Sequence, residues 1–468
     1  MSDRELTGQS PMKLANDTMS SLPADIARPR YDRTALKAGI VHVGLGNFHR
    51  AHQAWYLHRL MQQGLALDWA IIGAGMRPYD AAMRDKLLEQ DCLTTLIELD
   101  PAGASAEVVG SMIDYLPVED GNAPLIAAMA NPRIRIVAMT VTEGGYYIDP
   151  AEGTFDARHP DIRHDAANPE TPRTVFGAII AALKQRRADG TGPFTVQSCD
   201  NLQGNGAITR SAVLGLARLS APDLADWIDL NCSFPNSMVD CIVPATGEKE
   251  IALARRFGLD DAAPVTHENY RQWVIEDKFC AGRPEWERVG AIVTDQVHDF
   301  ETMKIRILNA GHQVIANPGE LLSLETIADC MSHPVIRPMF LKIEREEIAP
   351  YVKPVPGMTP DAYVDLIESR FAFEGAEVEE LIALGEEAVE NSNQLYAFTR
   401  VVKTGFDFKD RIEMIEMLWD VACADGEIHD FEANLVRRVA GLIHVSDRDS
   451  GAARKRALAR MGGSGAAQ

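Results

Sequence analysis

The chain has 468 residues, which corresponds to about three domains at roughly 150 residues per domain. Hydrophobic residues make up 46% and charged residues 24%, as in ordinary globular proteins, so the composition excludes a disordered chain, a fibrous repeat and a small disulfide scaffold. The formal net charge of −22 disfavours binding to nucleic acid and to anionic membranes, because their phosphates are negative too.

Targeting and redox signals point to the cytoplasm. The seven cysteines are scattered and never spaced as CxxC, which is typical of reduced thiols. The first 30 residues contain no apolar core of a signal peptide, and no window approaches 18 uninterrupted apolar residues. We therefore expect a cytoplasmic protein without a membrane partner.

The first half of the chain alternates between strand-like and helix-like segments. After a polar leader, the pattern predicts strands at 39–43, 69–72, 134–139 and 194–197 and helices at 49–60, 173–187 and 207–218. Strands that alternate with helices form a parallel sheet covered on both faces. The predicted class is α/β.

The second half is predicted to be helical. From about residue 266 the strand signal ends, and helices are expected at 299–317 and 321–330. The composition changes near residue 372, and an all-helical tail follows. We therefore divide the chain into a leader (1–37), a Rossmann-like α/β domain (38–286), a partial helical domain (287–372) and a tail (373–468).

A glycine turn after the first strand suggests a dinucleotide site. Gly44 and Gly46 allow the backbone to turn tightly and to approach a pyrophosphate at the start of the next helix. The pattern is GxGxxH, because His49 stands where a third glycine is expected. An ordinary tight turn is the alternative.

An acid after the second strand suggests the choice of coenzyme. Asp80 could accept hydrogen bonds from ribose hydroxyls, which favours NAD, although an exposed helix cap is the alternative. Arg77 could instead bind a 2′-phosphate. NAD is the expected cofactor.

The segment 301–312 carries three polar groups suited to alcohol oxidation. On an α-helix, Lys304, His312 and Asn309 would lie at roughly 0°, 80° and 140° around the axis. A lysine with a pKa lowered by desolvation can remove a hydroxyl proton, while amide and imidazole groups hold the substrate oxygen. No HxxxH or CxxC grouping offers a metal site, so we expect none. A solvated helix face is the alternative.

Five motifs in order resemble the long-chain polyol dehydrogenases of the mannitol 2-dehydrogenase family. The resemblance runs over about 39–371, and its motifs lie at 44–52, 142–146, 198–202, 233–236 and 304–312. It implies that Lys304 is the general base and that Asn309 and His312 orient and polarise the substrate oxygen. It further implies a donor at Asn201, a substrate hydroxyl ligand at Asp240 and a proton gate at Glu301.

The same resemblance implies an NAD site. The residues that it assigns to the cofactor are Gly44, Leu45, Gly46, Asn47, Phe48, Asp80 and Glu143. Structural alternatives remain: Asp240 as an ion-pair partner, Asn201 as a turn residue and Glu143 as a cap.

The tail resembles a different family. Residues 393–400, 408–419 and 424–428 are similar to the second half of the tellurite-resistance TerB family, and they replace the last part of the dehydrogenase helical domain, which is truncated. Asp425, Glu427 and Glu432 could bind a hard divalent cation, with a capped interhelical turn as the alternative. The tail could also cover the truncated helical domain or contact another chain.

The expected function is therefore NAD-dependent, metal-independent interconversion of a polyol such as mannitol and its 2-ketose. One alternative is a catalytically impaired, cofactor-binding fusion whose tail mediates metal or partner interactions in stress response. Another is a fructuronate reductase, which differs in substrate only.

Overall fold

The computed structural model describes residues 11–100, 103–149, 153–372, 408–422, 436, 439–440 and 445–463. The chain divides into two compact units. The first consists of Met1–Lys304 with Lys353–Gly357, and the second of Ile305–Val352 with Met358–Gln468. Each unit is described on its own.

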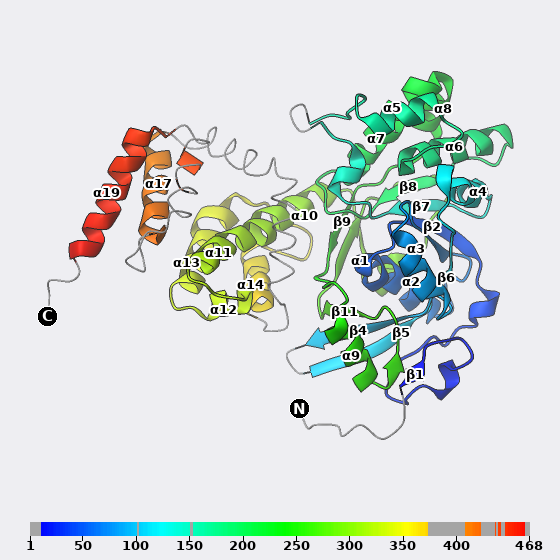
Figure 1. The fold of residues 1–468 in the computed structure, drawn as a ribbon, viewed down its shortest axis with the longest axis horizontal. Coiled ribbons are helices and arrows are strands. Elements are labelled where there is room, and N and C mark those ends of the chain that lie inside the picture. Colours follow the sequence, from blue (N-terminus) through cyan, green and yellow to red (C-terminus); the bar gives the residue numbers. More distant parts are fainter. Residues whose placement is uncertain are drawn as a thin grey trace. The chain divides into compact units, whose positions relative to one another are not determined.

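A five-stranded parallel sheet forms the centre of the first unit (Figure 1). Its strands are β2 (Ala38–Val43), β3 (Ala70–Ala74), β6 (Met112–Tyr115), β7 (Ile136–Met139) and β8 (Thr195–Ser198). Their order is β6-β3-β2-β7-β8, so the direction of winding reverses beside β2. In such sheets, ligands bind at the carboxyl ends of the strands at this reversal. The predicted parallel sheet is confirmed.

Helices cover both faces of this sheet, because successive side chains of a strand point to opposite sides. Ile40 packs into one core cluster and Val41 into the other, and Ile136 and Val137 divide in the same way. One face is covered by α1 (Asn47–Ala51), α2 (Gln53–Met61) and α3 (Asp80–Leu88). The other is covered by α4 (Ala123–Ala130), α5 (Pro160–Ala167), α6 (Val175–Ala188), α7 (Asn205–Ser220) and α8 (Pro222–Asn231).

The sequence pattern did not predict the strands outside the central sheet. They are β1 (Met12–Lys13), β4 (Thr94–Asp100), β5 (Gly103–Val109), β9 (Ser237–Asp240), β10 (Leu259–Asp260), β11 (Val265–Glu268), β12 (Gln272–Ile275) and β13 (Ile292–Val293). The expectation that strands end near residue 266 is therefore wrong. Six of these strands have two to four residues, too short to show a period in the sequence, whereas β4 and β5 have seven residues each and were missed as well.

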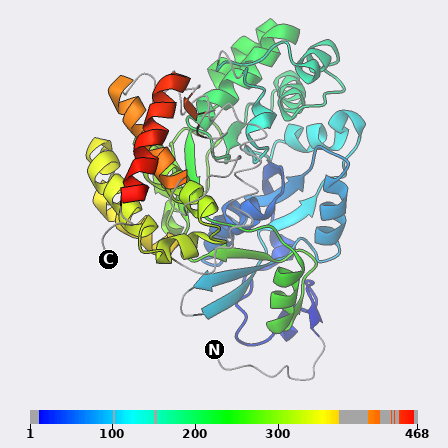
Figure 2. The same ribbon diagram turned by 60° about the vertical axis from the view of Figure 1, so that its left-hand side comes forward.

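The leader is packed against this part of the first unit. Strand β1 pairs with β10, and Leu14, Leu22 and Ile26 are buried in a core cluster with residues of β4, β5 and α9 (Glu248–Arg256). Figures 1 and 2 show α9 and β1 beside β4 and β5. The leader is therefore polar in composition but supplies apolar side chains to the core.

The helical segment after residue 296 departs from its expected form. Helix α10 (Val297–Met303) is followed by a π-helical turn, η6 (Lys304–Asn309), and then by α11 (Ala310–Leu321). The spacing of 100° per residue used for Lys304, Asn309 and His312 therefore does not apply, because a π turn bonds i to i+5. The helix expected at 321–330 is also wrong, since α12 (Ile327–Ser332) begins only after Thr326 caps it by accepting the Asp329 N–H.

The second unit continues with α13 (Ile336–Lys342), a second π turn, η7 (Ile343–Ile348), a 3-10 turn, η8 (Ala349–Tyr351), and α14 (Pro360–Phe371). Its tail contains α17 (Phe408–Ala422) and α19 (Asp447–Gly463), which pack together around Ile415 and Trp419, as the helical period predicted. The acidic candidates Asp425, Glu427 and Glu432 lie outside the described residues, as do the TerB-like residues 393–400.

Candidate functional site

The glycine turn lies at the carboxyl end of β2, where the sheet reverses. Gly44 has a φ of +87°, and a Cβ at this position would lie 1.9 Å from the Thr140 carbonyl oxygen, so only glycine fits. A Cβ at Gly46 would meet no heavy atom of the described residues within 4 Å. The turn is thus closed toward the sheet and open on the other side, as the close approach of a pyrophosphate requires.

His49 occupies the place of the third glycine without blocking the turn. Its ring is buried and stacks on His42 of β2, with 3.4 Å between the ring centroids. Burial and the neighbouring His42 hold its pKa well below the ordinary value, so the ring is neutral. The helix expected at 49–60 is interrupted at His52, whose φ and ψ of −116° and −94° separate α1 from α2.

The other residues assigned to the turn hold it in place. Asn47 donates through Nδ2 to the Pro244 carbonyl, at 2.7 Å, and to Thr246 Oγ1, at 3.0 Å. Leu45 is buried, and the Phe48 ring stacks on His52 with 4.8 Å between centroids. The Asn47 side chain therefore holds the first turn of α1 against the loop after β9.

The two acids assigned to the coenzyme lie on opposite sides of β2. Asp80 begins α3 after β3, and its Oδ2 accepts the N–H groups of Met76, at 2.8 Å, and Arg77, at 2.9 Å. Glu143 is exposed at the start of a 3-10 turn, η4 (Glu143–Tyr146), after β7. Both therefore follow strands next to the glycine turn.

The Lys304 amine is buried between two strand ends. The residue is only 6% exposed, and its Nζ donates to Asn201 Oδ1 at 2.8 Å and to the Val239 carbonyl at 2.6 Å. Asn201 follows β8, and Val239 precedes Asp240, the buried last residue of β9. The structure thus brings Lys304 and Asn201 together beside Asp240. The solvated helix face that was the alternative for Lys304 is not what the structure has.

His52 is close to the same group. Burial lowers the pKa of His52 to about 3, while the nearby Asp240 acts to raise it and the nearby Lys304 to lower it. Its Nε2 lies 3.1 Å from the Gln272 carbonyl oxygen. His52 directly precedes α2, so the start of that helix lies near Asp240 and Lys304.

Glu301 precedes Lys304 by three residues and approaches a side chain at the surface. It is 4% exposed, and its Oε1 accepts the Gly204 N–H at 3.0 Å. Its Oε2 lies 3.5 Å from Nδ1 of His298, whose side chain is 72% exposed. Burial raises the pKa of Glu301, which makes it a better proton acceptor than an ordinary glutamate. The assignment of Glu301 as a proton gate stays a prediction.

Asn309 and His312 belong to the second unit. Asn309 ends the π turn η6, and His312 lies in the first turn of α11. The His312 ring lies against Phe371, with 4.3 Å between centroids. Both are half-buried. Their assignment to the substrate oxygen stays a prediction.

Sequence reasoning missed a buried network at the end of β8. Asp200 accepts the N–H groups of Val141 and Thr142, each at 3.0 Å, and the Tyr146 hydroxyl at 2.6 Å. Burial raises the pKa of Asp200. The network fixes the loop after β7 against the strand end that carries Asn201. The available signal was the position of Asp200, an acid two residues after the buried strand β8.

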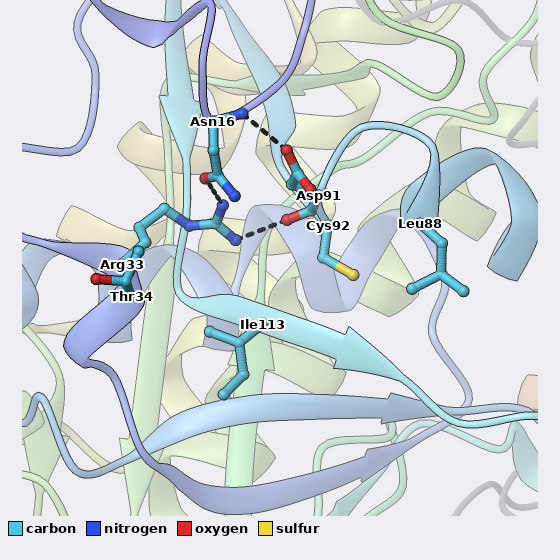
Figure 3. A pocket seen from close by; sticks show the side chains of 7 residues that line it. All are labelled: Asn16, Arg33, Thr34, Leu88, Asp91, Cys92 and Ile113. Atoms are coloured by element: carbon cyan, nitrogen blue, oxygen red, sulfur yellow. Dashed lines mark hydrogen bonds between the residues drawn. The ribbon is translucent and has the colours of Figure 1, made fainter.

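A cavity of about 170 Å³ lies elsewhere in the first unit, between the leader and β6 (Figure 3). It is lined by Asn16, Arg33, Thr34, Leu88, Asp91, Cys92 and Ile113. Arg33 donates to the carbonyls of Gly110, Asp91 and Met112 and to the Asn16 side chain, so its charge serves the fold. Burial raises the pKa of Cys92 to about 12, which makes its thiol unreactive.

The described residues contain no group of three or more His, Cys, Asp or Glu side chains placed to hold a metal ion. Within the same residues, every helix is too short or too polar to cross a membrane.

Three family models match the chain. The mannitol dehydrogenase Rossmann domain matches residues 38–288, and the mannitol dehydrogenase C-terminal domain matches 296–378. The tellurite resistance protein TerB model matches 360–455. The dehydrogenase models cover the glycine turn and Lys304, whereas the TerB model covers the tail.

The similar proteins include mannitol 2-dehydrogenases and a D-sorbitol dehydrogenase. The chain is 58% identical to mannitol 2-dehydrogenase of Cereibacter sphaeroides over 74% of its own length and 72% of that protein. It is 45% identical to mannitol 2-dehydrogenase of Pyricularia oryzae over 74% of the chain and 70% of that protein. Among solved structures, the Pseudomonas fluorescens mannitol 2-dehydrogenase complex with NAD and D-mannitol matches with a TM-score of 0.74 and 44% identity, over 77% of this chain and 74% of that one. A D-sorbitol dehydrogenase matches with a TM-score of 0.73 and 40% identity, over 77% and 75%.

Proposed function

Since the chain belongs to the mannitol dehydrogenase family, we propose that it oxidises a polyol such as mannitol to the 2-ketose, and catalyses the reverse, with NAD as coenzyme. The observation that carries the proposal is the buried Lys304 amine, which Asn201, after β8 of the central sheet, and the Val239 carbonyl, in β9 of a separate sheet, hold in place. The carboxyl end of β8 belongs to the edge where α/β sheets bind their ligands.

The glycine turn supports the coenzyme. Gly44 can only be glycine, and Gly46 leaves room for a pyrophosphate next to the first backbone N–H groups of α1. A bound nicotinamide coenzyme would supply the hydride acceptor. The chain itself must then remove a proton from the substrate hydroxyl.

Lys304 is the proposed general base. An uncharged amine can accept the hydroxyl proton as the hydride leaves, and Asn201 fixes the direction of that amine. We assign Asp240 to a further substrate hydroxyl, and its position next to Val239, which accepts from Lys304, supports this assignment. Asn309 and His312 are assigned to the substrate oxygen from the motif at 304–312.

The proton then has to reach solvent. We assign this step to Glu301, because its carboxylate is buried next to the lysine segment and its other oxygen approaches the exposed His298. A metal ion is not needed in this scheme, since the lysine and amide groups supply the electrostatics. We propose a cytoplasmic location from the scattered spacing of the cysteines in the sequence.

A substrate screen tests the proposal. The purified full chain is mixed with NAD and mannitol, sorbitol or arabinitol, and the absorbance of the reduced coenzyme is followed. Fructose and fructuronate are supplied with NADH for the reverse direction. We expect turnover of at least one polyol and of its ketose. Turnover of fructuronate alone would favour the reductase, and no turnover with any substrate would contradict both.

The tail favours a second candidate function. The match to the dehydrogenase C-terminal model ends at residue 378, and the TerB match occupies 360–455. A chain that binds coenzyme without turnover would support an impaired fusion whose tail contacts a metal or a partner. The activity of the full chain is compared with the activity of a version that ends at residue 372. Equal activity of the two proteins would show that the tail is dispensable for catalysis.

A further inference from the structure

Polar side chains are buried in the core of the first unit, between the central sheet and the helices α1 and α2. His42 of β2, Gln53 of α2 and Gln197 of β8 are each 1% exposed or less. A polar group in such a position destabilises the fold unless it is hydrogen-bonded. The partners of these three side chains therefore indicate what they do.

The three side chains form one line of contacts that ends at the glycine turn. The Gln197 and Gln53 amides lie 3.2 Å apart, and the Gln53 amide lies 3.1 Å from Nδ1 of His42. Nε2 of His42 lies 2.9 Å from Oγ1 of Thr140, the residue that follows β7. Thr140 in turn donates to the Gly44 carbonyl. Because β2, β7 and β8 are neighbours in the sheet (Figure 1), the line crosses the sheet from β8 to the turn.

The line ends on the atom that closes the turn. The Gly44 carbonyl oxygen also accepts the Gly46 N–H, at 3.0 Å. On the other side, the Thr140 backbone supports Gly44, since a Cβ there would lie 1.9 Å from the Thr140 carbonyl oxygen. A turn that is held in this way before the coenzyme arrives loses little freedom on binding, which favours affinity.

Counting protons gives the line a direction. Thr140 donates its hydroxyl proton to Gly44, so its oxygen must accept from Nε2 of His42. Burial lowers the pKa of His42 to about 3, and a neutral imidazole has a single N–H, so Nδ1 must accept. Gln53 therefore presents its amide N–H to the ring and its oxygen to the N–H of Gln197.

This direction also gives Gln197 Nε2 a partner. With Gln53 Nε2 facing Gln197 Oε1, Gln197 Nε2 has no hydrogen-bond partner among the described residues. Half a rotation of both amides exchanges their oxygen and nitrogen atoms and removes this cost, and such amides are oriented by the network that they join. All donors then point from β8 toward the glycine turn, and bonds aligned in this way strengthen one another.

We propose that His42, Gln53 and Gln197 are positioning residues for the coenzyme, because their aligned hydrogen bonds hold the Gly44 carbonyl through Thr140 and keep the glycine turn in the form that binds a pyrophosphate. The three residues act through the turn and not by contact with the coenzyme. The inference rests on the proposed function and extends its coenzyme site into the core of the sheet. It gives Gln197, which β7 separates from β2, a role in coenzyme affinity.

Coenzyme binding and steady-state kinetics test the line at both ends and in the middle. Thr140→Val, Gln53→Met and Gln197→Met each remove hydrogen bonds and nearly keep the size of the side chain. NADH is titrated into each full chain, well below its Tm, and its fluorescence is followed. We expect the dissociation constant to rise about threefold to tenfold, the loss of a neutral hydrogen bond. With saturating NAD, kcat and KM for mannitol should stay within about twofold.

A double variant distinguishes a connected line from independent bonds. Gln53→Met already breaks the line, so the addition of Gln197→Met should weaken NADH binding no further. Gln62→Met is the matched control, because Gln62 lies at the other end of α2 and bonds to the Arg28 carbonyl and to His58. It should leave the affinity for NADH unchanged.

The tautomer of His42 gives an independent readout. In the chain labelled with 15N-histidine, the ring of His42, assigned through its loss in His42→Gln, should carry its proton on Nε2. A proton on Nδ1 would overturn the inference, as would unchanged NADH affinity in all three variants, a fully additive double variant, or an equal loss in Gln62→Met. If the parent binds NADH and oxidises a polyol in these cases, the proposed function survives. A parent that does not bind NADH would overturn the proposed function, and the inference with it.

Discussion

Nζ of Lys304 lies 2.8 Å from Oδ1 of Asn201, at a place where the lysine is almost completely buried. The amide oxygen is neutral, so it orients the amine without favouring the ammonium form as strongly as a carboxylate would. We therefore expect the proposed activity of the site to depend on a neutral group at position 201.

Asn201→Asp tests this dependence. A carboxylate beside the amine favours the charged lysine, so the pKa that governs polyol oxidation should rise by about one unit. The pH profile of kcat/KM for oxidation checks the shift, with Asn201→Ala as the control that removes the contact without adding charge. The same apparent pKa in all three proteins would contradict the assignment.

Glu301 and His298 should act in the transfer of the proton to solvent. Glu301→Gln keeps the acceptor of the Gly204 N–H but cannot take up a proton, so oxidation should slow by about a hundredfold. His298→Ala should cause a smaller loss, because water can reach the outer end of this path.

Imidazole buffer separates the two residues. It should restore the rate of His298→Ala, whose missing group is exposed, and should not restore Glu301→Gln, whose missing carboxylate is buried. Unaltered rates in both variants would show that the proton leaves by another route.

Buried histidines should make the first unit sensitive to acid. Burial lowers the pKa values of His42, His52, His58 and His267 to about 3, from an ordinary value of 6.5. In the unfolded chain these histidines bind protons below about pH 6.5, whereas in the folded state burial disfavours their protonated form. The stability that these residues contribute is complete above that pH and is lost as the pH falls toward 3.

Calorimetry between pH 7 and pH 4 measures the effect on Tm. We expect Tm to fall steadily over this range, and the fall to be smaller in His58→Gln, which keeps a polar side chain near Tyr31 and Gln62. A Tm that does not change with pH would mean that these rings are charged, or accessible, in the folded state.

Glu344 should have the opposite effect in the second unit. It is buried in the π turn η7, and neither carboxylate oxygen has a hydrogen-bond partner among the described residues. Burial raises its pKa to about 8, from an ordinary 4.5. The folded state thus favours the protonated acid, and stability is lost as the pH rises from 4.5 through 8.

Glu344→Gln should remove this loss, so the variant should gain stability over the parent at pH 8 and little at pH 5. Glu346→Gln, at an exposed position of the same turn, should leave stability within about 0.5 kcal/mol. Urea unfolding at the two pH values measures both. Equal effects of the two substitutions would contradict the assigned protonation state.

The sequence predicted the parts of the fold that depend on local pattern. The apolar run of β2 and the backbone conformation required of Gly44 are both local, and such patterns predicted the turn and the strands β2, β3, β7 and β8 of the central sheet. The strand β6 of the same sheet was not predicted. Short strands such as β12 could not be predicted, because their partners are distant in sequence. The π turn at 304–309 was also missed, since its residues read as an ordinary helix.

The site was predictable to a similar extent. Lys304 and Asn201 were found through motifs, but their contact joins residues 103 positions apart. The bracing of the β7 loop by Asp200 and the approach of His298 to Glu301 depend on folded geometry, so no spacing in the sequence revealed them.

Chemical rescue of Lys304→Ala tests the central claim most directly. Oxidation of the best polyol is measured in the parent, in Lys304→Ala and in Lys184→Ala, a control at an exposed lysine of α6. We predict a loss of about a hundredfold or more in Lys304→Ala alone, with unchanged coenzyme affinity, and partial recovery with small primary amines that increases with their basicity. A rate in Lys304→Ala within a few-fold of the parent would contradict the account.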